Sequence, residues 1–388
     1  MVIHKAYRLK LYPNKTQEKR LLEIADGARF VWNYYLAQKR DRYLMGGKSP
    51  SYLQCARDLT DLKRQDGMEW LDGVLVHPLQ QSLRSLDRAY GAFFRKSAQF
   101  PRFKSKKDSR RSFRIPVGWK LRGSKLQIER GVVIRMRGTH PPMKARQMSV
   151  TVSRDACGTW WASILTEQEI KPKKKTGAPL GVDLGLNHLA VLSDGRKIEN
   201  IRPRKQLQKR MKTLQRLLAR KEKGSNASIL VKLALARLHR KVGYVRSNHL
   251  HHVSKQIASE NQAVIVCEDL AVKNMIRNHR LASSIADASW SELIRQLQYK
   301  QEWSGGTLVK IGRFFPSSKT CSSCGFIIQE LALSVRYWTC PSCHESHDRD
   351  VNAAKVIASQ WPGNGLARRV QMVSRPSGRE RVTGSVKR

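Results

Sequence analysis

The sequence CSSCGFIIQELALSVRYWTCPSCHESHDRDVNAA, from Cys321 to Ala354, combines four cysteines with a cluster of acids. Its four cysteines follow the pattern C-x2-C-x15-C-x2-C, at Cys321, Cys324, Cys340 and Cys343. Two such pairs can close a tetrahedral Zn²⁺ site with no open position, which is the arrangement of structural zinc. Four ordinary buried cysteines are the alternative, and the two matching spacings argue against it. The segment therefore predicts a zinc ribbon whose metal replaces a core that so short a segment cannot build.

Acidic residues follow this ribbon directly, although the chain is poor in acids. Asp350 begins DVNAAKVIA, a predicted helix, while Asp183 lies in the apolar strand LGVDLGL and Glu268 ends the strand AVIVCE. A lone buried carboxylate is costly unless a cation compensates it. Three carboxylates converging at the ends of adjacent elements would bind Mg²⁺, with Mn²⁺ as an alternative, and two such ions could support phosphodiester hydrolysis. The competing acids are Asp269, Asp287 and Asp348, and spacing alone does not separate Asp348 from Asp350.

The charge of the chain points to a polyanionic partner. Its 388 residues are 40% apolar, as in a folded protein, but 74 Lys and Arg face only 30 Asp and Glu, a net charge of +44. Nucleic acid is the usual partner that neutralises such an excess. The longest apolar runs are about five residues, far below the roughly 20 that span a bilayer. We expect a cytoplasmic, nucleoid-associated protein without a membrane partner, in which Cys55, Cys157 and Cys267 form no disulfides.

A basic segment is interleaved with aromatic residues between Phe100 and Arg114. Cations next to Phe100, Phe103 and Phe113 suit phosphate contacts together with base stacking. A merely solvated basic face is the alternative. The cations are Arg102, Lys104, Lys106, Lys107, Arg110, Arg111 and Arg114. The predicted helical hairpin 202–246 is similarly basic.

Hydrophobic periodicity predicts the remaining elements. Residues 6–12 alternate as a strand with one basic face, and Asn14 and Gln17 then fit a helix cap. Residues 15 to about 98 are predicted to be mostly helical, with Pro78 as a break, and residues 113–166 to be β structure that includes the first strand. The basic linker 171–179 marks a boundary. Beyond it, alternating strands and helices predict an α/β sheet, with a helix from Trp290 to Trp303.

His249 and His251 imitate the His-x-His pair of single-strand transposases. Those histidines must project together from a strand, whereas the periodicity around them is helical, so their side chains diverge. We therefore disfavour that function.

Three segments resemble a known family. GVDLGLNHLAVLSDG, VIVCEDLAVKNM and the cysteine-rich stretch ending in DRDVNAA are similar to the three RuvC-type motifs and the zinc ribbon of the transposon-encoded TnpB family. The resemblance extends over about residues 3 to 358. It implies that Asp183, Glu268 and Asp350 are the catalytic carboxylates, because the family's third acid stands in Asp-x-Asn-Ala-Ala. It also places Arg336 near the site, where it would contact the scissile strand or remain a solvated surface residue.

The resemblance implies a domain organisation. Residues 178–316 and 345–362 would form an RNase H-like (RuvC-like) α/β nuclease domain with the zinc ribbon, 317–344, inserted in it. Residues 1–13 and 113–170 would form a β-rich, β-barrel-like wedge domain, with the helical nucleic-acid recognition domain 14–112 as its insertion. Residues 363–388 would be a basic disordered tail.

The expected function is RNA-guided cleavage of double-stranded DNA beside a short motif. The partners would be a guide RNA from the transposon end and the target DNA, and a monomer is favoured. A nuclease-inactive RNA-guided repressor and a small type V CRISPR effector are the alternatives. The three acids argue against the repressor, and gene neighbourhood would separate the CRISPR effector.

Overall fold

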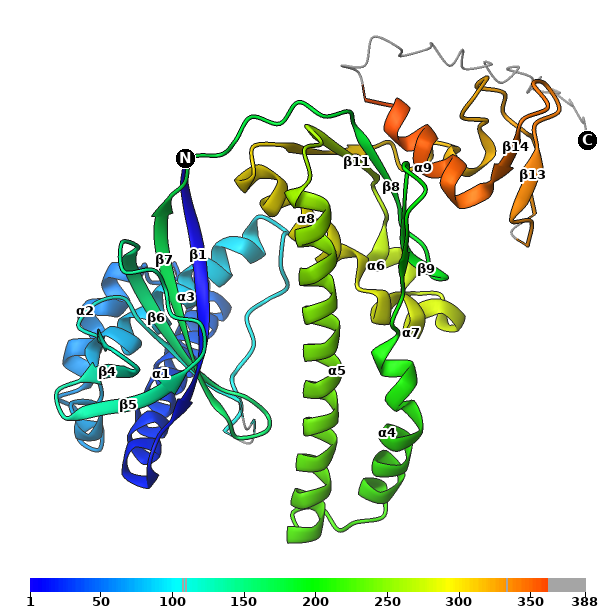
Figure 1. Ribbon diagram of the computed structural model, residues 1–388. Helices are drawn as coiled ribbons and strands as arrows, with labels where there is room; N and C mark the ends of the chain where they lie inside the picture. Colours follow the sequence, from blue (N-terminus) through cyan, green and yellow to red (C-terminus); the bar gives the residue numbers. More distant parts are fainter. Residues whose placement is uncertain (107, 109, 333, 362–388) are drawn as a thin grey trace, which may run out of the picture. The chain divides into compact units, whose positions relative to one another are not determined.

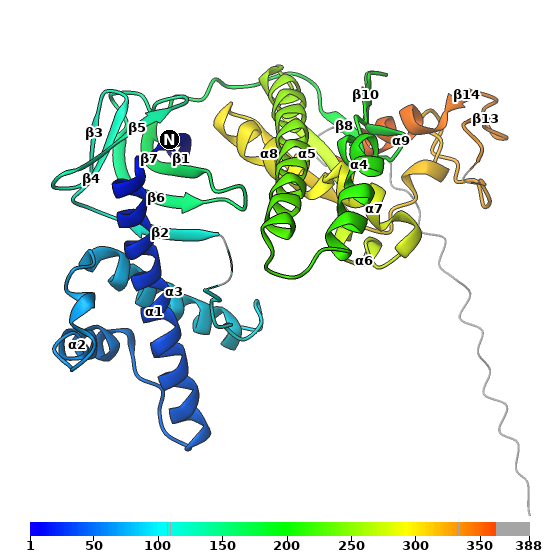
Figure 2. The same ribbon diagram turned by 90° about the horizontal axis from the view of Figure 1, so that it is seen from below.

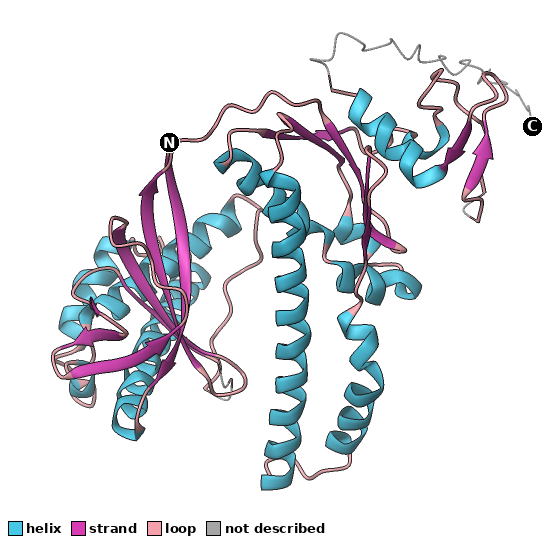
Figure 3. Cartoon of the chain, viewed as in Figure 1, coloured by secondary structure: helices cyan, strands magenta, loops and turns pink. Residues whose placement is uncertain are grey.

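The structure is a computed structural model that describes residues 1–106, 108, 110–332 and 334–361. Lys107 and the predicted tail 363–388 lie outside the described residues. The chain forms two units: residues 1–171 with 210–240, and residues 172–209 with the chain from Lys241 onward (Figures 1 and 3). Among the described residues, no helix combines the length and the apolar character needed to cross a membrane.

Unit 1 is built on a seven-stranded antiparallel sheet in the order β2-β6-β7-β1-β5-β4-β3. Its strands are β1 (Val2–Tyr12), β2 (Arg111–Ile115), β3 (Lys120–Arg122), β4 (Lys125–Glu129), β5 (Val132–Arg137), β6 (Arg146–Arg154) and β7 (Trp160–Glu169). The first strand, β1, is the central strand of this sheet. Its predicted membership of the sheet is therefore confirmed. The hydrogen-bonded ladders run from β2 at one edge of the sheet to β3 at the other. The expectation of a β-barrel-like domain stays a prediction.

Three helices of unit 1 lie between β1 and β2 along the chain. They are α1 (Lys15–Leu44), α2 (Tyr52–Leu62) and α3 (Val76–Phe94), with a short 3-10 helix at Glu69–Leu71. Asn14 caps α1, because its side chain accepts from the Gln17 backbone N–H and the Gln17 side chain accepts from the Asn14 N–H. Pro78 was predicted to break a helix but lies in the first turn of α3, where a missing N–H costs nothing. Figures 1 and 2 show α1 and α3 side by side.

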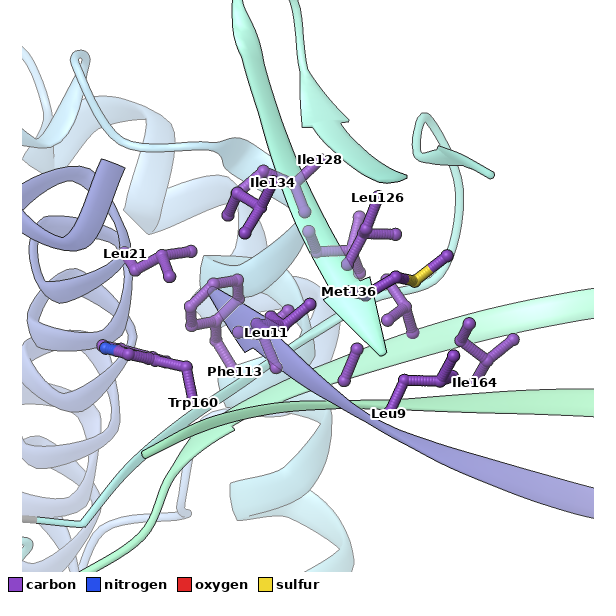
Figure 4. Close-up of a cluster of buried hydrophobic side chains, with 14 of the residues drawn as sticks. Leu9, Leu11, Leu21, Phe113, Leu126, Ile128, Ile134, Met136, Trp160 and Ile164 are labelled. Carbon is purple, nitrogen blue, oxygen red and sulfur yellow. The ribbon is translucent and has the colours of Figure 1, made fainter. Parts of the chain in front are cut away.

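The core of unit 1 lies between the sheet and α1. Alternate residues of β1 and β5 point inward: Leu9 and Leu11 meet Ile134, Met136 and the α1 residue Leu21 (Figure 4). The residues between them in sequence therefore face outward. Unit 1 also includes the end of the helical hairpin, where Arg240 Nη1 lies 3.2 Å from Asp155 Oδ2 in the turn between β6 and β7.

Unit 2 contains a mixed five-stranded sheet in the order β10-β9-β8-β11-β12. Its strands are β8 (Leu180–Asp183), β9 (His188–Leu192), β10 (Lys197–Glu199), β11 (Val264–Glu268) and β12 (Thr307–Ile311). The first three are antiparallel, and β8, β11 and β12 are parallel neighbours. The helices are α4 (Pro203–Ala219), α5 (Asn226–Ser259), α6 (Val272–Met275), α7 (His279–Ala288), α8 (Trp290–Trp303) and α9 (Arg349–Ser359); residues 210–240 of α4 and α5 are grouped with unit 1.

The two faces of this sheet carry different helices. Val182, Ile265 and Cys267 pack with α5, α7 and α8 on one face. Val264 and Val266 pack on the opposite face with Ile357 of α9. The ribbon adds a 3-10 helix (Ser317–Lys319) and the hairpin β13 (Tyr337–Thr339) and β14 (Ser346–Asp348), which runs directly into α9.

Candidate active site, metal centre and nucleic-acid interface

Asp183 and Glu268 end two neighbouring parallel strands. In the ladder between β8 and β11, Gly181 pairs with Val266 and Val182 with Cys267. Because side chains alternate along a strand, Asp183 lies on the same face as Gly181, and Glu268 on the same face as Val266. That is the face that α9 covers. The two carboxylates therefore emerge at one edge of the sheet, as the sequence predicts.

Helix α9 brings the third acid to this edge through a close approach of backbones. A Cβ on Gly181 would overlap the carbonyl oxygen of Ala354, so only glycine allows the contact. Asp350 lies one turn before Ala354, about 6 Å along the helix, and Asp183 lies two residues after Gly181, about 6.6 Å along the strand. The charge of Asp350 acts on Asp183, so the third acid lies near the first.

Burial and the neighbouring acids together shift the pKa of Asp183. Burial, followed by the negative charges of Glu268 and Asp350, raises the pKa of Asp183 to about 7 against the weaker opposing effects of Arg349 and the Leu184 N–H. A raised pKa means that a proton or a cation would stabilise this group of carboxylates, and carboxylate oxygens are the donors that Mg²⁺ favours. Among the described residues, only the four cysteines place three or more ligand atoms within 4.8 Å of one another, so the carboxylates are more widely spread.

The competing acids have other partners in the structure. Asp348 caps α9 by accepting from the N–H groups of Asp350 and Val351, and it pairs with Lys197 at 2.6 Å. Asp287 accepts from the first N–H groups of α4 and pairs with Arg246, and Asp269 pairs with Arg313.

The three candidate acids have fewer hydrogen-bond and ion-pair partners than the competing acids. Glu268 accepts one hydrogen bond from Ser317 Oγ at 2.5 Å, and Asp350 Oδ1 lies 3.5 Å from Arg336 Nη1. The hydrogen-bond and ion-pair partners of the two side chains thus differ, which their spacing in the sequence could not reveal. Arg336 is half exposed and lies next to Asp350.

The four predicted cysteines converge on one point. The sulfurs of Cys321 and Cys343 are 3.6 Å apart, as are those of Cys324 and Cys340. This separation is too long for a disulfide and equals the edge of a tetrahedron of thiolates around a metal. The Phe326 backbone N–H lowers the pKa of Cys324 to about 7, which favours the thiolate. Cys55 and Cys267 are buried core residues, as predicted, and Cys157 lies in the predicted turn.

The cluster is tied to α9 by residues that the sequence did not reveal. Asn352, 2% exposed, donates from Nδ2 to the Thr320 carbonyl at 2.7 Å and accepts from the Ser322 N–H at 2.8 Å. Arg349 donates to the carbonyl of Ala332 at 2.8 Å. Both Thr320 and Ser322 flank the first ligand, so the ribbon holds the helix that carries Asp350. The sequence signal that pointed to Asn352 was its place two residues after the candidate acid Asp350.

A further tie is His347 of β14. Its Nε2 lies 3.1 Å from Cys321 Sγ, and its ring lies against Trp338, with ring centroids 5.0 Å apart. His347 is itself buried and immediately precedes the cap of α9. The ribbon and the third acid therefore form one packed unit, which explains why the cysteine pattern stands directly before the acids.

The basic segment of unit 1 lines a pocket of about 710 Å³. Asn33 holds the segment by donating to the Lys104 carbonyl and accepting from its N–H, and Trp32 donates to the Arg102 carbonyl. Of the predicted cations, Arg102, Lys104, Arg110 and Arg111 line the pocket, joined by Arg29 and Arg154. Lys106 is exposed, and Arg114 bonds Ser149 instead.

This pocket retains an excess of positive charge. Arg110 and Arg111 are partly neutralised by Asp108 and Asp26, at 2.9 Å and 3.2 Å. Lys104 instead lies 4.0 Å from the centre of the Trp32 ring, and burial lowers its pKa. The pocket therefore offers cations and aromatic surface together, a combination suited to a nucleic-acid backbone.

The histidine pair lies on α5, as its helical periodicity indicates. His249 Nε2 is 3.1 Å from the Glu199 carbonyl oxygen. In the described part of the chain, no group of candidate ligand atoms within 4.8 Å includes these histidines. The pair does not form the metal site of a single-strand transposase.

Comparison with known proteins agrees with this arrangement. Family models described as "Helix-turn-helix domain", "Probable transposase" and "Cas12f1-like, TNB domain" match residues 1–48, 163–279 and 290–357. Residues 1–48 nevertheless contain one strand and one long helix rather than a helix-turn-helix. The third match covers the cysteine cluster and most of α9.

Two curated relatives match nearly the whole chain. "Putative RNA-guided DNA endonuclease" of Streptomyces pristinaespiralis is 37% identical over 98% of this chain and 96% of its own length. "Putative RNA-guided DNA endonuclease InsQ" of Escherichia coli (strain K12) is 36% identical over 91% of each chain. The chain belongs to the transposon-encoded TnpB family.

A solved structure shows the same fold. The protein chain in "Cryo-EM structure of the Cas12f1-sgRNA-target DNA complex" matches 92% of this chain and 99% of its own length, with a TM-score of 0.60 and 13% identity. At that identity the likeness concerns the fold, which is that of a compact type V effector.

Proposed function

We propose that the protein is an RNA-guided DNA endonuclease that cleaves double-stranded DNA next to a short motif by metal-dependent phosphodiester hydrolysis. The observation that carries the proposal is the convergence of Asp183, Glu268 and Asp350 at one edge of a sheet. Two relatives that match 91–98% of this chain at 36–37% identity are named putative RNA-guided DNA endonucleases. The guide RNA would come from the transposon end.

The strand arrangement supports an RNase H-like nuclease domain. Three antiparallel strands followed by two parallel strands, with acids on the first and fourth strands and on the last helix, is the arrangement expected from the RuvC-type motifs. Mg²⁺ or Mn²⁺ held there would activate water and stabilise the leaving oxygen. The chain's own residues would hold the carboxylates in place, because Ser317 donates to Glu268 and Arg336 lies next to Asp350. Arg336 would also contact the scissile phosphate.

The other parts of the molecule would bind and position the nucleic acids. Zn²⁺ on the four thiolates would stabilise the ribbon without taking part in chemistry. The pocket of Arg102, Lys104, Arg110 and Arg111 would contact phosphates. Unit 1 would read the adjacent motif and hold the heteroduplex, while pairing with the guide reads the sequence. The protein would work at the nucleoid.

Two alternatives make different demands on the site. A nuclease-inactive repressor has no use for three neighbouring acids, one of which, Asp183, has its pKa raised to about 7 by burial and by the charges of the other two. A small type V CRISPR effector would have the same site, so the distinction lies in the source of the guide. Sequencing the RNA bound to the protein decides it: transposon-end sequence supports the proposal, and repeat-array sequence supports the CRISPR effector.

The test of the nuclease is to separate binding from cutting. Asp183→Ala should bind guide RNA and target as the wild type does, while its cleavage of a matched plasmid with Mg²⁺ falls by several orders of magnitude. Asp269→Ala is the matched control, because Asp269 is an exposed neighbour of the site that pairs with Arg313. It should cut normally. Normal cutting by Asp183→Ala would refute the site, and a wild type that binds but never cuts would support the repressor.

The salt dependence of the affinity for guide RNA tests whether the protein is an RNA-binding enzyme. With about 6–10 phosphate contacts, affinity for the guide should fall by orders of magnitude between roughly 50 and 200 mM salt. A preparation free of RNA that still cuts one specific site would contradict RNA guidance.

A further inference from the structure

An exposed aromatic ring lies close to Glu268, in the loop that follows β12. Arg313 donates to the carboxylate of Asp269 at 2.6 Å, and Ser317 Oγ donates to Glu268 at 2.5 Å. Both ends of this short segment are therefore fastened to the two acids at the carboxyl end of β11. Phe314 lies between these two attachments and is 94% exposed, so its ring stands in solvent near Glu268.

A second exposed ring lies close to Asp350, in the hairpin of the ribbon. Tyr337 of β13 is 74% exposed and lies opposite Asp348 of β14, the residue that caps α9. Arg336, the residue before it, has its Nη1 atom 3.5 Å from Asp350 Oδ1. Lys197 Nζ lies 2.6 Å from Asp348 Oδ2. This ring, like the first, therefore has both a cation and a candidate catalytic acid nearby.

The position of these two rings distinguishes them from ordinary surface residues. Single exposed aromatic side chains are common and need no explanation by themselves. No other aromatic side chain in the described residues is more exposed than Phe314 and Tyr337, however, and each adjoins one of the candidate acids. The loop of Phe314 can also bury a ring, because the adjacent Phe315 packs against the cluster of Ile311 and Ile357. The exposure of Phe314 thus indicates a ligand rather than the lack of a core.

An unpaired nucleic-acid strand suits these rings best. Aromatic side chains stack on bases of any sequence because every base has a π-face, and the bases of a strand must be free of a duplex to be reached in this way. Pairing of a guide with one strand of the target leaves the other strand displaced and unpaired. The carboxylates repel a phosphate, so stacking provides a contact that does not depend on charge.

We propose that Phe314 and Tyr337 are positioning residues, which stack on unpaired bases next to the scissile phosphate and so hold that phosphate at the three acids. The inference rests on the proposed function of a DNA endonuclease. Neither ring acts on the reacting atoms. Their contribution is to fix a flexible strand in the orientation that the reaction needs. The bases that the rings hold would therefore influence which phosphate is cut.

The test combines the removal of the rings with the removal of the bases, in the full-length protein loaded with its guide RNA. The ring variant is Phe314→Ala, Tyr337→Ala. The matched control is Phe94→Ala, Tyr43→Ala, which removes the same two residue types from positions of unit 1 that are 67% and 73% exposed. A conservative variant, Phe314→Trp, Tyr337→Phe, keeps an aromatic ring at both positions.

The substrate is the matched target DNA, either intact or with abasic sites in place of the nucleotides that flank the cut in the displaced strand. Pairing with the guide is unchanged, because the abasic sites are not in the paired strand. The rate of cutting of that strand is measured in single turnover with Mg²⁺, together with the affinity for the target and the Tm.

The ring variant should cut the intact target roughly 5- to 100-fold more slowly than the wild type. Its affinity for the target and its Tm should not change, because guide pairing supplies the affinity and both rings lie in solvent. Abasic sites should slow the wild type, the control and the conservative variant by similar factors. They should slow the ring variant much less, since the stacking they remove is already gone.

Three results would overturn the inference. The first is a ring variant that cuts the intact target at the wild-type rate, and the second is a conservative variant as slow as the ring variant. The third is a slow ring variant that loses the same further factor as the wild type on the abasic target, because its rings would then act on the protein rather than on the bases. Failure of the proposed function would differ from all three, as a guide-loaded wild type that cuts no target.

Discussion

The backbone of Gly181 lies directly against the carbonyl oxygen of Ala354, with no room for a side chain between them. This contact sets the depth at which α9 lies on β8, and through it the position of Asp350 relative to Asp183. The active-site geometry thus depends on two residues that carry no functional group.

Gly181→Ala should abolish cleavage. The added Cβ must push α9 away from β8, which should cost roughly 1–3 kcal/mol of stability and lower cleavage at least 100-fold, because the third carboxylate moves with the helix. Plasmid cleavage and thermal melting measure the two effects. Gly312→Ala is the matched control, since a Cβ there meets nothing within 4 Å. Equal activities of the two variants would show that the close contact does not position the site.

Asp183→Asn should stabilise the metal-free protein, and more so at high pH. The native pKa of Asp183, about 7, lies above the ordinary value of 3.8, so the folded wild type binds the proton more tightly and loses stability as pH rises through 7. Asparagine carries no charge and therefore avoids this loss of stability, which amounts to at most roughly 4 kcal/mol. Melting in EDTA at pH 5 and pH 8 should show the larger gain at pH 8.

Added Mg²⁺ provides the internal control for this experiment. It should raise the melting temperature of the wild type at pH 8 more than that of Asp183→Asn, because the ion offsets the repulsion only where the carboxylate is present. An identical gain from the substitution at both pH values would argue that Asp183 is not buried among charges.

Asn352→Ala should impair cutting without releasing the ribbon's metal. The substitution leaves the buried Thr320 carbonyl and Ser322 N–H without partners, at a cost of roughly 1–3 kcal/mol for each group. Cleavage should fall tenfold or more because α9 is no longer held to the ribbon, while zinc content stays at the wild-type level. Ser359→Ala, at an exposed position of the same helix, should cut normally. Loss of zinc from Asn352→Ala would instead assign the residue to the folding of the ribbon.

Cys340→Ser should release zinc and stop cleavage. Structural zinc contributes roughly 10 kcal/mol or more to the folding of small domains, so the ribbon should unfold and displace Asp350. Metal content and cutting are measured together, with Cys157→Ser, a turn residue of unit 1, as the control that keeps both. A Cys340→Ser protein with one zinc per chain and normal activity would exclude the four cysteines as its ligands.

Local patterns predicted the elements of the nuclease well. The helix Trp290–Trp303 has both predicted ends, and the apolar flanks of Asp183 and Glu268 placed them on strands. These features are local because side-chain periodicity follows from the geometry of each element. Helix α7 was not predicted.

Such local patterns could not predict contacts between segments that lie far apart along the chain. Asp287 caps a helix 83 residues away along the chain, and Asn352 bonds a carbonyl 32 residues earlier. Which acids are neutralised, and which are left facing one another, depends on those pairings. For the same reason Asp348 and Asp350 could be separated by resemblance or by structure but not by spacing.

The path of the chain through the hairpin of α4 and α5 bears on attempts to divide this protein into halves. A cut at the linker near Lys171 would separate residues 1–171 from residues 210–240, which complete the same unit. The amino-terminal fragment would then carry Asp155 without Arg240, its ion-pair partner. A break at the hairpin loop, around residues 221–225, would separate the same pair and would also divide the sheet of unit 2, with β8, β9 and β10 in one fragment and β11 and β12 in the other. Split reporters or inducible two-piece versions of the enzyme should therefore rely on reassembly of the two fragments rather than on their independent folding.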